Sequence, residues 1–550
     1  MQLVFIMVIA FVWLAGTIFR IYRQARYYQI EEYKSNRYIR WLFSERDRWL
    51  PTRPVGVFLV GMIFAFFTDS IPGETSFLPY IIHIIIAALA VYPPDEGEIK
   101  KAFVRTQRAT RLLGAAFFLA FLATMLLFAL RQLAPIPTSD RFQAVFMGIG
   151  GIGLFIFAPI WLMLGNILMT PLEGFMRRRF IKKAENVLAV INPKIIGITG
   201  SYGKTTTKNF LRDMLNGRYK TYATPKSYNT LMGVCLAINN DMANDYSIEY
   251  FISEMGAYVE GEIQRITELT PPDISIVVEV GPQHLERFGT LENVAAAKYE
   301  IIKALPQQGL AIFNWDNPYV REMYDRGYPD NRIAVSRELS PDNLPENPPR
   351  FIASDITETL NGLSFAVTDT ETGASEFIET PVIGIHNVTN LLLTIAVCVH
   401  EGMSLRDVAF RAKTLQPAES RLVRQVTDSG ITIINDAYSA NPVGVISALK
   451  VLGLHQSGKR LLITPGMIEL GDMQEAENRK LGELATQYAS DIILVGEKQT
   501  APLKAGILST DFSQEHLQVV DNLSDAIDWY KDNLKAGDTV LFLNDLPDTY

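Results

Sequence analysis

At 550 residues, the chain exceeds the usual size of one domain, so two or three units are expected. Its formal net charge of −8 argues against a general nucleic-acid-binding protein, and we expect no nucleic-acid partner. The two cysteines, Cys235 and Cys398, are too few for a four-cysteine zinc site. Both lie in apolar stretches, which predicts buried, reduced thiols.

Long apolar runs in the first third of the chain predict an α-helical membrane region over residues 1–183, with about five transmembrane helices. The runs cover residues 3–19, 55–67, 77–92, 112–130 and 142–168. A bilayer core of about 30 Å requires about 20 helical residues. The fourth and fifth runs are long enough, the first is near the lower limit, and the second and third need their flanks. A re-entrant hairpin is the alternative for the second and third runs.

The first run is not predicted to be a cleaved signal peptide, because no Lys or Arg precedes it and no small-residue cleavage site follows it. No Asp, Glu or Lys lies in the middle of any run, so a proton or ion relay is not indicated. His83, in the third run, is predicted to pack between helices or to lie at the interface. The sequence leaves open whether this region only anchors the chain or also forms part of a substrate site.

The loops between the runs differ in positive charge, and this difference predicts the membrane topology. Nine Lys and Arg residues lie between positions 20 and 53, five follow the third run, and five follow the fifth. The stretch 69–76 has none, and only Arg131 and Arg141 follow the fourth run. The positive-inside rule then places the N-terminus outside and the C-terminal body in the cytoplasm. We therefore expect an integral protein of the cytoplasmic (inner) membrane.

From residue 184 onwards, short apolar strands alternate with helical stretches, which predicts an α/β fold with a mainly parallel sheet covered on both faces. A turn-rich segment with several prolines leads into short alternating pieces up to residue 382, and we interpret it as a hairpin at the domain's edge. A second α/β series near residue 416 predicts a smaller, Rossmann-like domain. The expected boundaries are 184–415 for a central domain and 416–550 for a C-terminal domain.

Residues 195–207 combine a buried strand, a glycine-rich turn and a helix that begins with hydroxyl residues. This arrangement points backbone N–H groups and a helix N-terminus at a phosphate. Lys204 is expected to contact the outer phosphates, and Thr205 to offer its hydroxyl to Mg²⁺. Ile198 occupies the first glycine position of the strict pattern, so the motif is the shorter G-x-x-G-K-T. The predicted nucleotide-binding residues are Gly200, Ser201, Tyr202, Gly203, Lys204, Thr205 and Thr206.

Five further motifs follow the phosphate loop. They are TPKSYNTLMGV at 224–234, EMGA at 254–257, GPQHLERFG at 281–289 with AK at 297–298, SR at 420–421, and NDAYSANP at 435–442. Together the six elements resemble those of the Mur ligase family, whose members use ATP to join an amino acid or peptide to a carboxylate through an acyl phosphate. Within the family, Tyr438 and Asn441 follow the pattern of the member that adds the dipeptide D-Ala-D-Ala.

The resemblance implies ATP and two Mg²⁺ ions as the expected cofactors. Thr205 and Glu254 would hold one ion between the β- and γ-phosphates, and His284 would hold the second near the acyl phosphate. Lys298 would either contact phosphate or, carbamylated like the matching lysine in many relatives, become a metal ligand. The implied catalytic residues are Lys204, His284, Lys298 and Arg421.

The resemblance also implies the contacts to the nucleoside. Asn314 matches the position that meets adenine. His386 and Asn387 begin an apolar helix beside the nucleotide, and N-capping is the alternative role for them. Arg421 would reach the γ-phosphate and Asp436 the ribose when the C-terminal domain closes. Closure would exclude water, which matters because an acyl phosphate hydrolyses readily.

One departure from the family bears on the substrate. Soluble members carry an N-terminal domain that binds a uridine nucleotide, whereas this chain has predicted apolar helices in that position. The expected reaction adds D-Ala-D-Ala, or a similar amine or amino acid, to a carboxylate of a peptidoglycan precursor, with membrane lipid as a further partner. The alternatives are a lipid-linked acceptor, another envelope polymer such as a poly-γ-glutamate type, or a non-catalytic ATP-binding scaffold. Glu469, Asp472 and Glu475 resemble a family loop and either orient the amine or form a solvated acidic loop.

Overall fold

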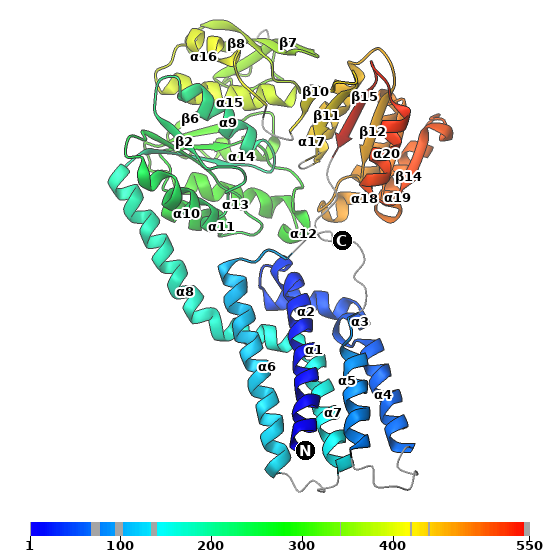
Figure 1. Ribbon diagram of the computed structural model, residues 1–550. Helices are drawn as coiled ribbons and strands as arrows, with labels where there is room; N and C mark the ends of the chain where they lie inside the picture. The colour runs from blue at the N-terminus through cyan, green and yellow to red at the C-terminus, as the bar shows by residue number, and fades with distance from the viewer. Residues whose placement is uncertain are drawn as a thin grey trace. The chain divides into compact units, whose positions relative to one another are not determined.

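The computed structural model describes residues 2–67, 77–93, 103–133, 140–340, 343–417, 421–437 and 440–543. Three motif residues, Ser420, Tyr438 and Ser439, lie outside these ranges. The chain divides into two compact units, one of residues Met1–Arg179 with Asp548–Tyr550 and one of residues Phe180–Pro547 (Figure 1). The predicted boundary at residue 183 lies close to this division, and the boundary at residue 415 stays a prediction.

The described part of the N-terminal unit is helical. Its helices are α1 (Gln2–Ile30), α2 (Ser35–Ser44), α3 (Arg46–Trp49), α4 (Thr52–Phe67), α5 (Leu78–Val91), α6 (Gln107–Leu133), α7 (Asp140–Ile156) and α8 (Ala158–Ile191), the last of which continues into the second unit. Figure 1 shows α1, α4, α5, α6 and α7 side by side as a bundle. Trp13 packs edge-on against Phe58 and Phe155, with ring centroids 6.0 and 6.2 Å apart. Gly151 permits this contact, because a Cβ there would lie 2.2 Å from the indole.

The predicted count of five membrane-spanning helices is not confirmed. Among the described residues, two helices, Gln2–Ile30 and Gln107–Arg131, are long and apolar enough to cross a bilayer, and the pair Phe142–Ile156 and Ala158–Ile191, bent by 61°, provides a third if it forms one span. Helices α4 and α5 have 16 and 14 residues, which correspond to about 24 and 21 Å of helix and fall short of a core of about 30 Å. Apolar composition is visible in the sequence, but helix length depends on where each helix ends.

His83 and the two cysteines are buried, as the sequence predicts. The His83 Nδ1 lies 2.8 Å from the Pro79 carbonyl oxygen within α5, and its ring packs near Gly148 of α7. This position agrees with the packing role expected for His83 rather than with an ion relay.

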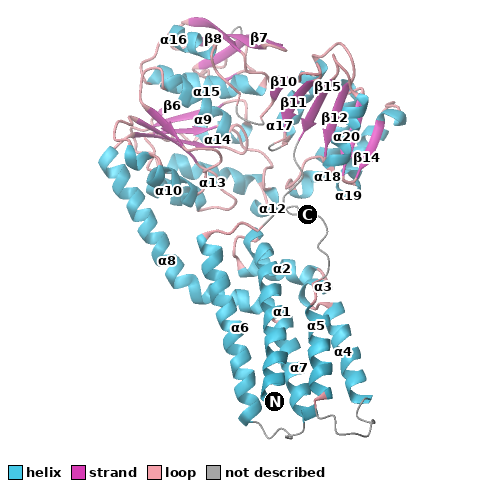
Figure 2. Cartoon of the chain, viewed as in Figure 1, coloured by secondary structure: helices cyan, strands magenta, loops and turns pink. Residues whose placement is uncertain are grey.

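The second unit contains a nine-stranded sheet with the order β2-β3-β1-β4-β5-β6-β7-β8-β9 (Figure 2). Its strands are β1 (Lys194–Thr199), β2 (Thr221–Ala223), β3 (Tyr250–Glu254), β4 (Ile274–Val277), β5 (Leu310–Asn314), β6 (Asn331–Ser336), β7 (Phe351–Thr359), β8 (Gly362–Asp369) and β9 (Ser375–Thr380). Strands β2 to β7 pair in parallel, and β7, β8 and β9 pair antiparallel. The predicted hairpin is therefore confirmed as an antiparallel extension of the same sheet.

Apolar side chains cover both faces of this sheet. The helices involved are α9 (Lys204–Leu215), α10 (Leu231–Asn240), α11 (Glu262–Leu269), α13 (Leu291–Lys303), α14 (Pro318–Asp325), α15 (His386–His400) and α16 (Leu405–Ala412). Helices α9, α15 and α16 share one buried cluster with the strands, and α10, α11, α13 and α14 share the other. The strands are buried almost throughout, which explains why they appear in the sequence as continuous apolar runs.

A second, six-stranded sheet has the order β10-β11-β15-β12-β13-β14, with only the β10–β11 pair antiparallel. Its elements are β10 (Val423–Val426), β11 (Thr432–Asp436), α17 (Pro442–Gly453), β12 (Arg460–Thr464), α18 (Gln474–Tyr488), β13 (Asp491–Val495), α19 (Glu497–Leu508), β14 (Leu517–Val520), α20 (Leu523–Asn533) and β15 (Thr539–Leu543). Helices α17, α18 and α19 cover one face and α20 the other. This confirms the predicted doubly wound C-terminal fold.

Candidate active site

The glycine-rich turn between β1 and α9 is closely packed. Gly203 precedes α9 with a φ of +78°, and a Cβ there would lie 2.5 Å from the Asn390 side-chain oxygen and 2.7 Å from Val278. A left-handed backbone with so little space requires glycine. The buried Ser201 hydroxyl donates to the Gly281 carbonyl at 3.0 Å, which ties the turn to the segment after β4.

Lys204 folds back over this turn. Its Nζ donates to the carbonyl oxygens of Gly200 at 2.6 Å and Ser201 at 3.1 Å. Burial lowers the pKa of Lys204 to about 8, with nearby Glu254 acting in the opposite direction. A phosphate placed over the turn would offer this ammonium a stronger partner than two neutral carbonyls.

Thr205, in the first turn of α9, lies beside Glu254, which ends β3, as predicted. The Thr205 hydroxyl donates to Glu254 Oε1 at 3.2 Å, and the Asn229 amide donates to the same oxygen at 3.2 Å. Burial alone would raise the pKa of Glu254, but Lys208 and Lys204 bring it below the usual value. A hydroxyl and an ionised carboxylate beside a phosphate site are the hard oxygen ligands that Mg²⁺ prefers, so these two residues fit the ion.

Lys208 is a site residue that the sequence analysis missed. Its Nζ donates to Glu254 Oε2 at 2.9 Å and to the Lys226 carbonyl at 2.7 Å, and both ionised side chains are 1% exposed. The available signal was its spacing: four residues after Lys204, it lies on the same face of α9. The pair keeps Glu254 ionised and fixes its direction.

His284 is brought to this site from the segment after β4. It precedes α12 (Leu285–Phe288) with a φ of +55°, and its Nδ1 hydrogen-bonds to the carboxylate of Glu469 from the C-terminal sheet. Burial lowers the pKa of His284, Glu469 acts against this, and Lys204 contributes to the lowering. Within the described residues, no cluster of three or more His, Cys, Asp or Glu side chains could hold a metal ion.

Lys298 lies on α13 and is 4% exposed. Burial, followed by the charge of Lys204, lowers its pKa well below the usual value. Among the described residues it makes no ion pair with an acidic side chain. Burial and the neighbouring Lys204 charge therefore both disfavour the charged ammonium form of Lys298.

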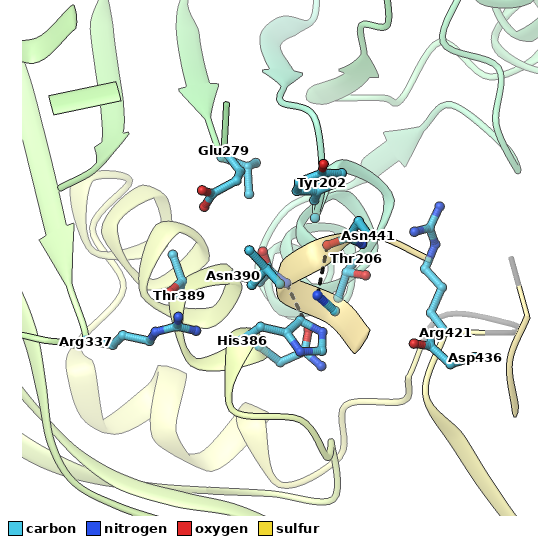
Figure 3. Close-up of a pocket in the computed structure, with 15 residues that line it drawn as sticks. Tyr202, Thr206, Glu279, Arg337, His386, Thr389, Asn390, Arg421, Asp436 and Asn441 are labelled. Atoms are coloured by element: carbon cyan, nitrogen blue, oxygen red, sulfur yellow. Dashed lines mark hydrogen bonds between the residues drawn. The ribbon is translucent and has the colours of Figure 1, made fainter. Parts of the chain in front are cut away.

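A pocket adjoins the phosphate loop and contains most of the predicted nucleotide contacts (Figure 3). The predicted residues that line it are Tyr202, Gly203, Thr206, His386, Asn387, Arg421 and Asp436. Burial lowers the pKa of His386 to about 4, and within the described residues its buried Nδ1 has no hydrogen-bond partner. A neutral imidazole with an unused polar atom in a pocket fits ligand binding. His386 and Asn387 do not cap α15, because the N-cap residue is Ile385.

Glu279, Arg337 and Thr389 also line the pocket and were missed (Figure 3). Asn314, predicted to meet adenine, is not among the lining residues; its amide donates to the Val278 carbonyl at 3.0 Å and to Glu279 Oε2 at 2.8 Å. Burial raises the pKa of Glu279 to about 7. The signal for Glu279 was its position at the carboxyl edge of the sheet, just before the Gly281–Gly289 motif.

The C-terminal sheet contributes Arg421 and Asp436 to the same pocket. The Arg421 guanidinium donates to the Thr205 hydroxyl at 3.4 Å. The Asp436 carboxylate accepts a hydrogen bond from the Leu422 N–H at 3.1 Å. Burial raises the pKa of Asp436 to about 6, although Leu422 and Arg421 act against this. Arg421 thus contacts the phosphate-loop helix directly, and Asp436 lines the same pocket.

Asp436 predicts a pH dependence of stability. Its folded pKa of about 6 lies above the ordinary 3.8, so its stabilising contribution is complete below about pH 4 and is lost as the pH rises through about 6. Asp436→Asn keeps the oxygen that accepts from Leu422 and removes the charge. At pH 8 the variant should exceed the wild type in free energy of unfolding by about 2 kcal/mol, allowing for partial exposure.

Unfolding temperatures of the two proteins at pH 5 and pH 8 test this expectation. The advantage of Asp436→Asn should be clearly larger at pH 8. An equal difference at both pH values would show that Asp436 does not titrate in this window.

Two family models match the second unit. The Mur ligase middle domain matches residues 198–398, and the Mur ligase glutamate ligase domain matches residues 420–544. The matches cover the strands and loops that carry the site described above.

Individual relatives and a solved structure agree with these matches. The chain is similar to the UDP-N-acetylmuramoyl-tripeptide--D-alanyl-D-alanine ligases of Bacillus subtilis (29% identity, 65% of this chain and 74% of the relative) and Mycobacterium leprae (31% identity, 63% and 70%). The crystal structure of MurF ligase from Thermotoga maritima in complex with ADP covers 67% of this chain and 80% of its own, with a TM-score of 0.57 and 24% identity. That likeness shows the shared fold.

Proposed function

Because this chain belongs to the Mur ligase family of ATP-dependent, amide-forming ligases, we propose that it adds D-Ala-D-Ala or a similar amine to a carboxylate of a peptidoglycan precursor. The observation that carries the proposal is the convergence of Lys204, the Thr205–Glu254 pair and Arg421 at one phosphate loop. Relatives named as D-alanyl-D-alanine ligases support the choice of amine.

The residues suggest how each step is assisted. An oxygen of the acceptor carboxylate attacks the γ-phosphorus, and ADP leaves. Lys204 and Arg421 neutralise the charge on the transferred phosphoryl group, which is the main requirement of such a transfer. The amine nitrogen then attacks the acyl carbon, the C–O bond to phosphate breaks, and inorganic phosphate leaves as the amine loses a proton.

Thr205 and Glu254 would hold one Mg²⁺, which when bound neutralises charge on the β- and γ-phosphates. His284 and Lys298 would serve a second ion. Carbamylation of Lys298 would supply the carboxylate that this second position otherwise lacks, and the burial that lowers the pKa of this amine favours that modification. Lys208 pairs with Glu254 and would keep this carboxylate oriented towards the first Mg²⁺.

The N-terminal unit supports a location at the membrane. Helices α1 and α6 are long enough to span it, and the bent α7–α8 pair provides a third span if the two helices cross the bilayer as one. Three spans, like five, are an odd number and put the two ends of this region on opposite sides of the membrane. The positive-inside rule would then place the N-terminus outside and the catalytic unit in the cytoplasm, where ATP is available. Family models leave residues 1–197 unmatched, which favours a lipid-linked acceptor as the second candidate.

The test is ATP-dependent phosphate release by the full-length, detergent-solubilised chain. The acceptors are UDP-MurNAc-tripeptide, its lipid-linked counterpart and a γ-glutamyl peptide, each with D-Ala-D-Ala or with a single amino acid. We expect release that requires UDP-MurNAc-tripeptide and D-Ala-D-Ala together. Release only with a lipid-linked or γ-glutamyl acceptor would keep the chemistry and replace the substrate. Release with none of them would favour a non-catalytic scaffold.

A further inference from the structure

His284 and Glu469 form a contact between the two sheets of the second unit. His284 precedes α12 beside the central sheet, and Glu469 lies in the loop between β12 and α18 of the C-terminal sheet. The His284 Nδ1 bonds to the Glu469 carboxylate, and the Leu285 N–H donates to the Glu469 carbonyl at 3.1 Å. Glu469 therefore holds the start of α12 with both its side chain and its backbone.

Both residues adopt an unusual backbone conformation. The φ angles of His284 and Glu469 are +55° and +61°, in the left-handed region that non-glycine residues rarely occupy. Such conformations persist where surrounding structure enforces them, and they concentrate at functional sites. Asn478 holds the start of the loop between β12 and α18. Its side-chain oxygen accepts from the Met467 N–H at 2.7 Å, and its amide donates to the Met467 carbonyl at 2.8 Å.

The hydrogen bond between the two side chains indicates which ring nitrogen of His284 carries the proton. An ionised carboxylate can only accept hydrogen bonds, so the proton of a neutral His284 ring lies on Nδ1. The lone pair is then on Nε2. The Tyr258 ring packs against the imidazole with centroids 4.5 Å apart, and the Arg287 guanidinium lies 4.4 Å from the Tyr258 ring centroid. These neighbours restrict rotation of the imidazole.

We propose that Glu469 is a positioning residue that presents Nε2 of His284 to a divalent cation. Carboxylates commonly orient metal-binding histidines in this way. The C-terminal sheet would thereby complete a cation site on the central sheet, and cation affinity would depend on the docking of the β12–α18 loop. This inference rests on the metal role of His284 in the proposed function.

Mn²⁺ binding tests the proposal without any turnover. The full-length protein is titrated with Mn²⁺ in the presence of ADP, and free Mn²⁺ is counted by electron paramagnetic resonance. Glu469→Ala should weaken the binding of one Mn²⁺ about tenfold, the range for loss of an orienting carboxylate. Glu469→Gln, whose carbonyl oxygen still accepts from Nδ1, should stay within about threefold of wild type. Glu483→Ala, which removes an exposed carboxylate on α18, is the matched control and should change nothing.

A double variant separates orientation from a general effect. If Glu469 acts through His284, then adding Glu469→Ala to His284→Ala should cause no further loss of Mn²⁺ affinity. Wild-type affinity in Glu469→Ala would overturn the proposal. So would an equal loss in Glu469→Gln and Glu469→Ala, since charge rather than orientation would then be the cause. Failure of the ligase assay with an intact Mn²⁺ effect would refute the substrate assignment and leave this role standing.

Discussion

Replacing Lys204 by alanine should lower ATP-dependent phosphate release about 10³-fold, because one pre-placed charge is lost from the site of phosphoryl transfer. In the structure the Lys204 Nζ lies over the turn, 2.6 Å from the Gly200 carbonyl oxygen. Arg421 reaches the same region, but its contact with the Thr205 hydroxyl, at 3.4 Å, is longer.

The pKa of about 8 makes the expected loss depend on pH in the free enzyme. Below pH 8 the ammonium is mostly charged, and a bound triphosphate would favour the charged form further. The kinetic measurement is kcat and KM for ATP at pH 7 for wild type and Lys204→Ala. Lys303→Ala, which removes an exposed lysine at the end of α13, is the control and should behave as wild type. Retention of more than a tenth of the activity in Lys204→Ala would contradict the assigned role.

Replacing Lys208 by methionine should destabilise the second unit by about 3–5 kcal/mol, because it leaves Glu254 buried without its cation. Both charged side chains are 1% exposed, so water cannot take the place of the lost partner. The Lys226 carbonyl would also lose its hydrogen bond at 2.7 Å. For a unit of this size, the unfolding temperature should fall by about 5–10 °C.

Two further variants define the cause. Lys208→Met combined with Glu254→Gln removes both charges and should recover most of the lost stability, while phosphate release stays abolished because the metal ligand is gone. Lys182→Met breaks an ion pair with Glu185 whose side chains are 70% and 44% exposed, and should change the unfolding temperature little. A Lys208→Met protein that unfolds within about 1 °C of wild type would show that the buried pair does not stabilise the fold.

Much of the catalytic unit could be predicted from the sequence because its signals are local. The phosphate loop requires a left-handed Gly203 directly before a helix, and both features are adjacent in the chain. Glu254 ends a strand that pairs with β1, so strand order alone brings it to Thr205. The hairpin at β7–β9 was likewise visible as alternating short pieces between turn residues.

The membrane region shows that apolar composition alone does not predict the number of membrane spans. Apolar runs indicate that a segment avoids water, but the number of spans depends on helix length and on bends, such as the 61° break between α7 and α8. Those features depend on how the helices pack against each other. The predicted apolar helices were therefore found in the described residues, while the predicted count of five spans is not confirmed.

The sequence by itself determined the phosphate loop, the alternation of strands and helices, and the identity of the residues that follow the strands, because each depends on neighbours in the chain. Only the tertiary structure decided that Lys208 pairs with Glu254, that Glu279 rather than Asn314 lines the pocket, and that Glu469 meets His284. Charged and polar side chains become partners when folding buries them together, and the cost of burying each one unpaired selects the partner. Lys208 and Glu254 are 46 positions apart in the chain, Asn314 and Glu279 are 35 apart, and His284 and Glu469 are 185 apart. No local sequence pattern can indicate pairs at such separations.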